Sequence, residues 1–252
     1  MSVAIQTAIR GLSVRQPWAW LLASGFKLVE NRSWNTTYRG PCLIQASSSK
    51  VAINDESIEN LIYSAGDAVF NLLNRPQPKE CPEIFQFGKA IGTVEIAGCV
   101  CTELTPEEYA DPHAYFDAIG ANPKGDRYTE DVAERAFELK CRQQGFGDWL
   151  KRAKESLAPH GLHPAYFATG EFCILIEPGS QKQFLQPFEM MGKLNLFKLD
   201  AELTAKVRTA SKSIGDPVQR WLDIENARVG VLRDAAKATV AKKQPVKKLA
   251  KK

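Results

Sequence analysis

Short apolar segments alternate with turn residues through the first fifty residues of the chain. LSVR (12–15) and CLIQAS (42–47) have the composition of short strands. Between them, WAWLLAS (18–24) predicts a short helix that Gly25 closes, because glycine readily adopts the left-handed conformation that ends helices. The next segment, KLVENRSW (27–34), alternates side chains with the two-residue period of a strand.

The middle of the chain changes to helical periodicity. Apolar side chains recur every three or four residues over 55–73, which predicts an amphipathic helix, and AIGTVEIAGCVC (90–101) then indicates a central strand. Residues 102–170 are polar and helix-prone, with a helix expected from 129 to 140. We therefore expect a helical insertion between two parts of one sheet.

Strand patterns return near residue 171. EFCILIEP (171–178) and KLNLFKL (193–199) are expected strands, joined by a loop that contains Pro178, Gly179, Pro187 and Gly192. After Asp200 the pattern is helical. The chain ends in KKQPVKKLAKK, whose lysines and few apolar groups predict disorder.

Composition places the chain among ordinary globular proteins. Hydrophobic residues make up 44% and charged residues 25%, and every apolar stretch is too short to cross a bilayer. The first residues lack the pattern of a secretory signal, so we expect no membrane association and a cytoplasmic location, or a nuclear one in a eukaryotic cell. The six cysteines form no CxxC pair, which favours reduced thiols.

The positive charge is concentrated at one end of the chain. Residues 200–252 hold 13 basic and 6 acidic side chains, a net charge of +7, whereas the remainder holds 20 and 23, a net charge of −3. Such an asymmetry is typical of a segment that contacts a polyanion. The helices of this segment also offer a surface for a protein partner.

An unusual group of charges lies between tryptophans at residues 27–34. Glu30 and Arg32 share one face of the expected strand with Trp34, whereas the face that Lys27 occupies is not determined by the pattern. The group offers donors for a phosphate or carbonyl, an acceptor for a base edge, and rings for stacking. The alternative is a structural ion pair on a sheet surface, with the tryptophans in the core.

The same residues carry a resemblance to a known family. A Gln-Pro-Trp turn, a short helix, the spacing Gly-x-Lys-x-x-Glu-x-Arg and an Arg-Gly turn follow one another, and PFEMMGKLNLFKLD (187–200) is similar to the closing segment of that family. The sequence thus resembles the ASCH domain, the module named after the activating signal cointegrator proteins. The matching residues are Gln16, Pro17, Trp18, Gly25, Lys27, Glu30, Arg32, Arg39 and Gly40.

This resemblance implies an α+β fold of the PUA-like type, which is a small β-barrel of five to six strands with flanking helices and a cleft beside the charged strand. We expect the domain to span residues 11–200, with the helical insertion at about 102–170. Residues 201–252 would form a basic helical segment that ends in the disordered lysine-rich tail.

The resemblance also implies that the protein binds RNA or a nucleotide-containing ligand, with single-stranded nucleic acid as the expected partner. Arg32 would hold a phosphate or base acceptor, Glu30 would hold Arg32 or a base amino group, and Trp18 or Trp34 would stack. The expected ligand-binding residues are Gln16, Trp18, Lys27, Glu30, Arg32, Trp34 and Arg39.

An enzymatic alternative comes from other members of the family. Small bacterial relatives hydrolyse N4-acetylcytidine with a Lys, a Thr and a Glu, and others are ribonucleases. Lys27 matches the lysine, but Glu30 occupies the position of the threonine. In this alternative Lys27 and Glu30 would be catalytic, and the distal glutamate would be Glu103, Glu107 or Glu108.

Other candidate sites are weaker. Cys99, Cys101, His160 and His163 supply four potential zinc ligands, but Cys-x-Cys on a strand is a poor chelating spacing, so we expect no metal. No cofactor is expected. NPKGDRY (122–128) lacks the spacing of a phosphate-binding loop, and the serines at 47–49 are expected to form a turn and a helix cap.

Overall fold

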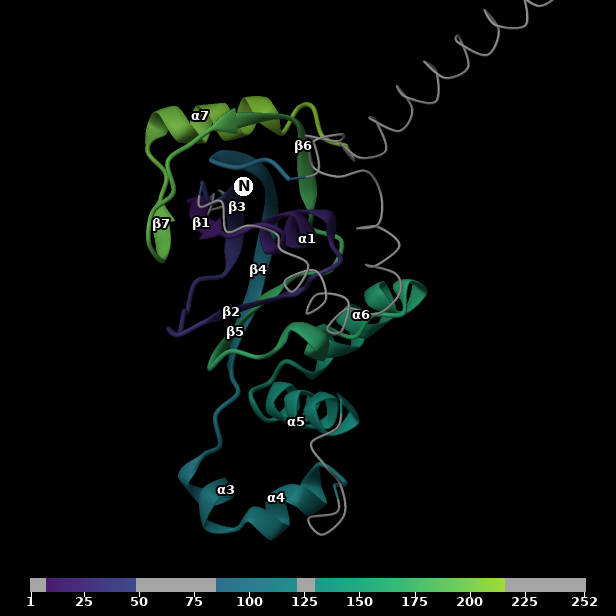
Figure 1. Cartoon of the computed structure of the whole chain (residues 1–252). Helices are drawn as coiled ribbons and strands as arrows, with labels where there is room; N and C mark the ends of the chain where they lie inside the picture. The colour runs from purple at the N-terminus through teal and green to yellow at the C-terminus, as the bar shows by residue number, and fades with distance from the viewer. Residues whose placement is uncertain (1–7, 49–84, 122–129, 216–252) are drawn as a thin grey trace, which may run out of the picture.

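The computed structural model of the chain describes residues 8–48, 85–121 and 130–215. Seven strands form one sheet, and helices lie around it (Figure 1). The strands are β1 (Arg10–Val14), β2 (Val29–Arg32), β3 (Gly40–Ala46), β4 (Lys89–Cys101), β5 (Phe172–Ile176), β6 (Lys182–Glu189) and β7 (Leu196–Lys198).

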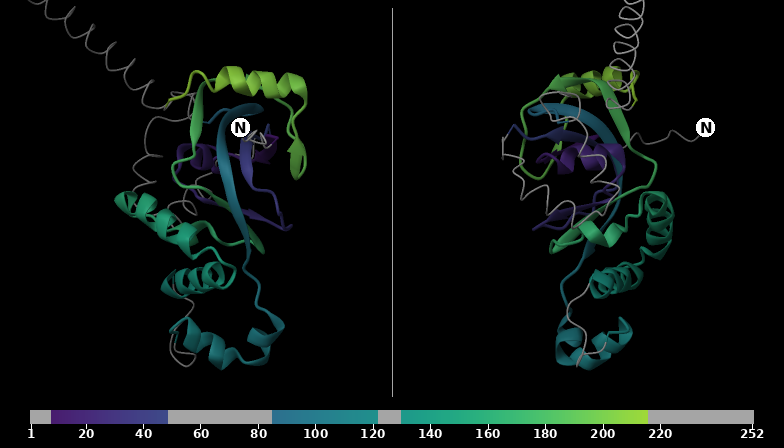
Figure 2. Two further views of the ribbon diagram at one scale, coloured as in Figure 1. Left: turned by 180° about the vertical axis from the view of Figure 1, so that it is seen from behind. Right: turned by 45° about the vertical axis from the view of Figure 1, so that its right-hand side comes forward.

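The sheet is mixed, with the order β2-β5-β4-β3-β1-β7 and with β6 paired to β4 beside this path. β1 and β3 run parallel, and the other pairs are antiparallel. β4 is the longest strand, with 13 residues, and Figure 2 shows it running from the α7 end of the molecule toward the insertion. The α+β expectation is confirmed. The strand pairings of the described residues do not close into a ring, and closure as a barrel stays a prediction.

The first helix is α1 (Trp18–Ser24), with the bounds that the sequence predicts. It ends at Gly25, whose φ of 86° is left-handed, and the glycine N–H donates to Leu22 O. Five of its seven residues are buried, and the helix contacts β3 and β4. This short helix therefore belongs to the main core and packs against the sheet.

The insertion consists of helices, as the sequence predicts. Figure 1 shows α3 and α4 farthest from the sheet, with α5 and α6 between. Trp149 anchors α6, because its ring is buried and its Nε1–H donates to Ile176 O of β5 at 2.9 Å. The elements are α3 (Pro106–Ala110), α4 (Pro112–Ala118), α5 (Glu130–Gln143), α6 (Gly147–Leu157), and the 3-10 turns η1 (Ala158–His160) and η2 (Pro164–Phe167).

Residues 182–189 form the strand β6, whereas the sequence predicts a loop between the last two strands. Phe184 is the only buried residue of β6. The sequence of this strand therefore lacks the apolar alternation that is typical of a half-buried strand. Pro187 also lacks the N–H that an inner strand donates, and it lies beyond residues 183–185, whose second side pairs with residues 213–215.

The last described helix is α7 (Ala201–Ala210), with Asp200 as its N-cap. The expected helix at 55–73, the remaining C-terminal helices and the lysine-rich tail lie outside the described residues. In the described part of the chain, no helix is long and apolar enough to span a membrane.

Candidate functional site

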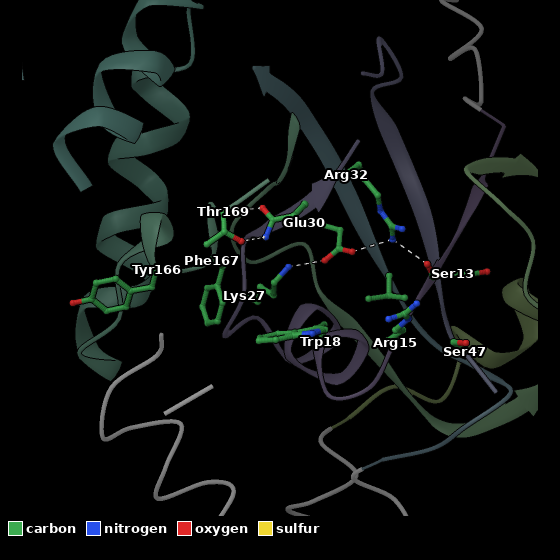
Figure 3. Close-up of a pocket in the computed structure, with 12 residues that line it drawn as sticks. Ser13, Arg15, Trp18, Lys27, Glu30, Arg32, Ser47, Tyr166, Phe167 and Thr169 are labelled. Atoms are coloured by element: carbon green, nitrogen blue, oxygen red, sulfur yellow. Dashed lines mark hydrogen bonds and ion pairs between the residues drawn. The ribbon is translucent and has the colours of Figure 1, made fainter. Parts of the chain in front are cut away.

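A pocket of about 540 Å³ opens between β1, β2, the start of α1 and the segment around η2. Figure 3 shows its lining, to which segments far apart in the sequence contribute. The lining residues are Ser13, Val14, Arg15, Trp18, Lys27, Glu30, Asn31, Arg32, Ser47, Tyr166, Phe167 and Thr169.

A chain of ion pairs crosses this pocket. Lys27 Nζ lies 2.6 Å from Glu30 Oε2, and Arg32 Nη2 lies 2.9 Å from Glu30 Oε1. Arg32 Nη2 also donates to Ser13 O at 2.9 Å, and Lys27 Nζ donates to Val29 O. The side chains of Lys27 and Glu30 are 3% and 9% exposed, and that of Arg32 is 22% exposed. Lys27 therefore points toward Glu30, which the sequence pattern did not determine.

Aromatic rings form the wall beside Lys27. The rings of Trp18 and Phe167 meet edge to face, with centroids 6.2 Å apart and an interplanar angle of 76°. Lys27 Nζ lies 5.8 Å from the centroid of Trp18 and 5.9 Å from that of Phe167, within the range of a cation–π contact. The ammonium group is thus held by a carboxylate on one side and by two ring faces on the other.

Side chains from two segments hold this wall in place. His163 Nδ1 accepts the Ala165 N–H at 3.2 Å and so caps η2, which carries Phe167. Asn31 of β2 donates to Thr169 Oγ1 at 3.0 Å and accepts the Thr169 N–H at 3.3 Å. The segment after η2 is therefore fastened to the strand that carries Glu30 and Arg32.

Four of the seven expected ligand-binding residues line the pocket, namely Trp18, Lys27, Glu30 and Arg32.

The other three occupy positions that do not line it. Gln16 is buried and accepts the Trp20 N–H while it donates to Gln86 O. Trp34 lies against the Arg32 guanidinium, with 6.0 Å from Cζ to the ring centroid, and Arg39 donates to Thr36 O and Tyr38 O. These contacts are structural, and ligand binding by the three residues stays a prediction.

The sequence reasoning missed several lining residues. Ser13 and Arg15 precede the Gln-Pro-Trp turn directly, so their position beside a recognised motif was an available signal. Tyr166, Phe167 and Thr169 lie in the insertion, about which the motif carries no information. Ser47, expected in a turn, lines the pocket, whereas the NPKGDRY segment lies outside the described residues.

The candidate zinc ligands make other contacts. Cys99 is buried, the His160 ring lies 5.0 Å from that of Phe26, and His163 Nε2 lies 3.2 Å from Glu138 Oε1. Within residues 8–48, 85–121 and 130–215, no group of three or more His, Cys, Asp or Glu side chains could hold a metal ion. The distal glutamate candidates Glu103, Glu107 and Glu108 do not line the pocket.

Burial keeps the thiol of Cys173, which contacts the pocket residue Asn31, protonated. Cys173 lies on β5 opposite Asn31, and desolvation raises its pKa to about 12, even though a hydrogen bond with the Gly170 backbone and the charge of Lys27 act in the opposite direction. A thiol with such a pKa is a poor nucleophile at neutral pH. The chemistry of the pocket therefore depends on its charged and aromatic side chains.

Comparisons with known proteins identify the family of the chain. A match to Activating signal cointegrator 1 from Homo sapiens is 35% identical over 100 residues, and that from Mus musculus is 33% identical over 100 residues. Each match covers 40% of this chain but spans only 16% of the relative's length. The sequence model of the ASCH domain matches residues 12–167, which include most of β1, all of β2, β3 and β4, and most of the insertion. The chain belongs to the ASCH domain family.

Proposed function

We propose that the protein binds RNA, or another ligand that contains a nucleotide, in the pocket lined by Trp18, Lys27, Glu30 and Arg32. The observation that carries this proposal is the joining of an aromatic wall to a chain of buried charges in one pocket. The association of the ASCH family with RNA binding supports the same function. The pocket volume of about 540 Å³ is within the range usual for small-molecule sites.

The chemistry of the pocket suits a nucleobase. Lys27 Nζ has three N–H groups, of which Glu30 and Val29 O take two, and the third is left for a base carbonyl. Glu30 accepts one bond at each oxygen from within the protein, and each oxygen has a second lone pair for a base amino group. Trp18 is half-buried and presents a ring on which a base can stack.

Binding accounts for these contacts better than hydrolysis does. The pocket lining contains one carboxylate among the described residues, Glu30, and two cations already hold it. In the hydrolase alternative, Lys27 would act as a base, but its ammonium group already donates to Glu30 and Val29 O and lies against two rings. We therefore propose a binding protein.

The remaining parts of the proposal concern the whole chain. The binding domain would span residues 11–200, and the basic segment 201–252 would add non-specific phosphate contacts or hold a protein partner. The protein would act in the cytoplasm, or in the nucleus of a eukaryotic cell.

Binding of an unstructured oligoribonucleotide to the full chain, followed by fluorescence anisotropy, tests this function. Trp18→Ala should weaken binding about tenfold or more, because loss of one base-stacking ring costs about 1–3 kcal/mol. Tyr109→Ala serves as the control, since Tyr109 is an exposed aromatic residue of α3 that does not line the pocket. Removal of the residues after Val240 should weaken binding less than Trp18→Ala does.

The opposite pattern would contradict the proposal. If Trp18→Ala, Lys27→Ala and Arg32→Ala bind like the unmodified chain at equal folded fraction, and removal of the tail abolishes binding, the pocket is not the nucleic-acid site. Urea unfolding of each variant establishes the folded fraction. Incubation with N4-acetylcytidine and with RNA, followed by product analysis, tests the hydrolase alternative separately.

A further inference from the structure

The pocket has two chemically different ends. Figure 3 shows Trp18, Phe167 and Tyr166 to one side of Glu30, and Arg15, Arg32, Ser13 and Ser47 to its other side. The first end is aromatic and the second is cationic and hydroxylic. A ligand that fills both ends must therefore itself have a planar part and a polar part.

Arg32 has donors that the protein does not use. Its Nη2 makes the two bonds to Glu30 Oε1 and Ser13 O, and its Nη1 donates to no described residue. Its buried Nε also has no partner among the described residues. Because buried polar groups are nearly always hydrogen-bonded in native proteins, a guanidinium with this many spare N–H groups indicates a missing acceptor.

Arg15 adds a second guanidinium at the same end. Its side chain is exposed and makes no ion pair with any carboxylate in the described part of the chain. Three basic side chains line the pocket against one acidic side chain, which is Glu30. The lining therefore has a surplus of two positive charges that an anion would balance.

Backbone and side-chain contacts fix this end before any ligand arrives. Ser13 O accepts a hydrogen bond from Arg32 Nη2, and Ser13 Oγ accepts the Lys193 N–H at 3.0 Å. Gly192 lies so close that a Cβ there would be 2.9 Å from Ser13 Oγ and 2.7 Å from Gln45 Oε1. The loop before β7 thus holds Ser13 in place, and Glu30 holds Arg32.

We propose that the cationic end is a phosphate subsite, formed by Arg15 and the unused N–H groups of Arg32, that binds the phosphate of a nucleotide whose base lies against Trp18. This inference rests on the proposed function and restricts it, since the ligand is then a phosphorylated nucleotide and not a free nucleoside. Guanidinium groups suit phosphate because their planar N–H pairs match its oxygens. Arg15, exposed at this end, allows the phosphate to belong to a strand that continues outside the pocket.

Calorimetry on the full chain with the four ribonucleosides and their 5′-monophosphates tests the subsite. The best-bound monophosphate should bind about tenfold or more tightly than its nucleoside, because charged hydrogen bonds of this kind contribute about 1.5–3 kcal/mol each. Arg15→Ala should reduce that ratio, and Arg15→Lys should retain part of it. Arg135→Ala is the matched control, since Arg135 is exposed on α5, away from the pocket lining.

An oligoribonucleotide supplies a second measurement that works even where monomers bind weakly. Arg15→Ala should lower the slope of log affinity against log salt concentration by about 0.7, the value expected for one phosphate contact on a single strand, whereas Arg135→Ala should not. Equal binding of nucleoside and monophosphate, or equal slopes for the two variants, would overturn the subsite but leave the pocket function intact. If Trp18→Ala binds all of these ligands as tightly as the unmodified chain does, the proposed pocket function is overturned instead.

Discussion

Two lysine–glutamate pairs in this protein have almost the same burial and very different surroundings. In the pocket, the side chains of Lys27 and Glu30 are 3% and 9% exposed, and in the insertion those of Lys140 and Glu108 are 3% and 12% exposed. Buried charges are costly wherever they occur, so burial alone does not distinguish a binding site from a structural ion pair.

The difference lies in what remains unsatisfied around each pair. Glu108 accepts bonds from the Thr105 N–H, Lys140 and Gln143, and forms a capping box that starts α3. That pair joins α3 to α5 and does not line the pocket that contains Glu30. Around Glu30, in contrast, Arg32 has unused N–H groups and the rings face an open volume. Unused donors beside a cavity are therefore the better indication of function.

The largest expected effect comes from removing one cation of each pair. Lys27→Met and Lys140→Met should each lower the free energy of unfolding by about 3 kcal/mol, because each leaves a buried carboxylate with one partner fewer. Urea unfolding measures this loss. Oligoribonucleotide binding should fall only for Lys27→Met, when compared at equal folded fraction. A loss of binding in Lys140→Met as well would remove the distinction between the pairs.

Replacing both members of a pair by apolar residues sharpens the comparison. Lys140→Met with Glu108→Leu should recover about 2 kcal/mol of the stability lost in Lys140→Met, because the uncompensated charge is gone. Lys27→Met with Glu30→Leu should recover less, because Arg32 then loses its carboxylate partner, and this double variant should still fail to bind RNA. If that double variant binds normally, the charged chain is structural and the pocket proposal is wrong.

Acid should weaken the ion pair of Glu108 in the insertion. Burial acts to raise the pKa of Glu108, but hydrogen bonds from Lys140, the Thr105 N–H and Gln143 outweigh it and hold the pKa below its usual value. A lowered folded-state pKa stabilises the protein above the unfolded-state pKa of about 4.3, and this stability is lost as the pH falls through the folded-state value. Stability measured against pH should therefore fall less steeply below pH 4 in Glu108→Gln.

The smallest expected effect concerns the histidine that caps the pocket wall. Burial lowers the pKa of His163, as does the charge of Lys154, while Glu134 and Glu138 act to raise it. The neutral ring is the form that accepts the Ala165 N–H, so protonation weakens the cap of η2. Because the folded-state pKa is lowered, stability is complete above the unfolded-state value of about 6.5 and declines below it.

His163→Asn tests this pH dependence. Asparagine keeps an acceptor for the Ala165 N–H but does not titrate, so thermal unfolding between pH 7.5 and pH 5.5 should show a smaller decline than in the unmodified chain. Both proteins keep Arg142 and Lys154, so the ion pairs of these residues with Glu138 do not account for a difference between them. An identical decline in the two proteins would place the titrating group elsewhere.

The sequence predicted the parts of the fold that depend on neighbouring residues. The bounds of α1 and the strand character of residues 29–32 follow from local periodicity and from Gly25. β6 could not be recognised, because only Phe184 of its residues is buried, so packing imposes little apolar pattern on them.

The site was predictable to the extent that it lies on one short segment. Lys27, Glu30 and Arg32 follow the family spacing, and strand alternation places two of them on one face. Phe167 and Thr169 reach the pocket only through tertiary contacts across more than a hundred residues, and neither carries a recognisable local signal. The direction of Lys27 also depends on Val29 O and Glu30, and the spacing does not specify it.

The pairing of β2 with β5 has a consequence for how the protein is made. Glu30 lies opposite Ile174 and Arg32 opposite Phe172, although the family match ends at residue 167. During synthesis, β2 leaves the ribosome early. It can pair with β5 only after more than a hundred further residues have been made. A fragment that stops where the family match stops would therefore contain every motif residue from Gln16 to Gly40, yet would leave β2 without this partner strand.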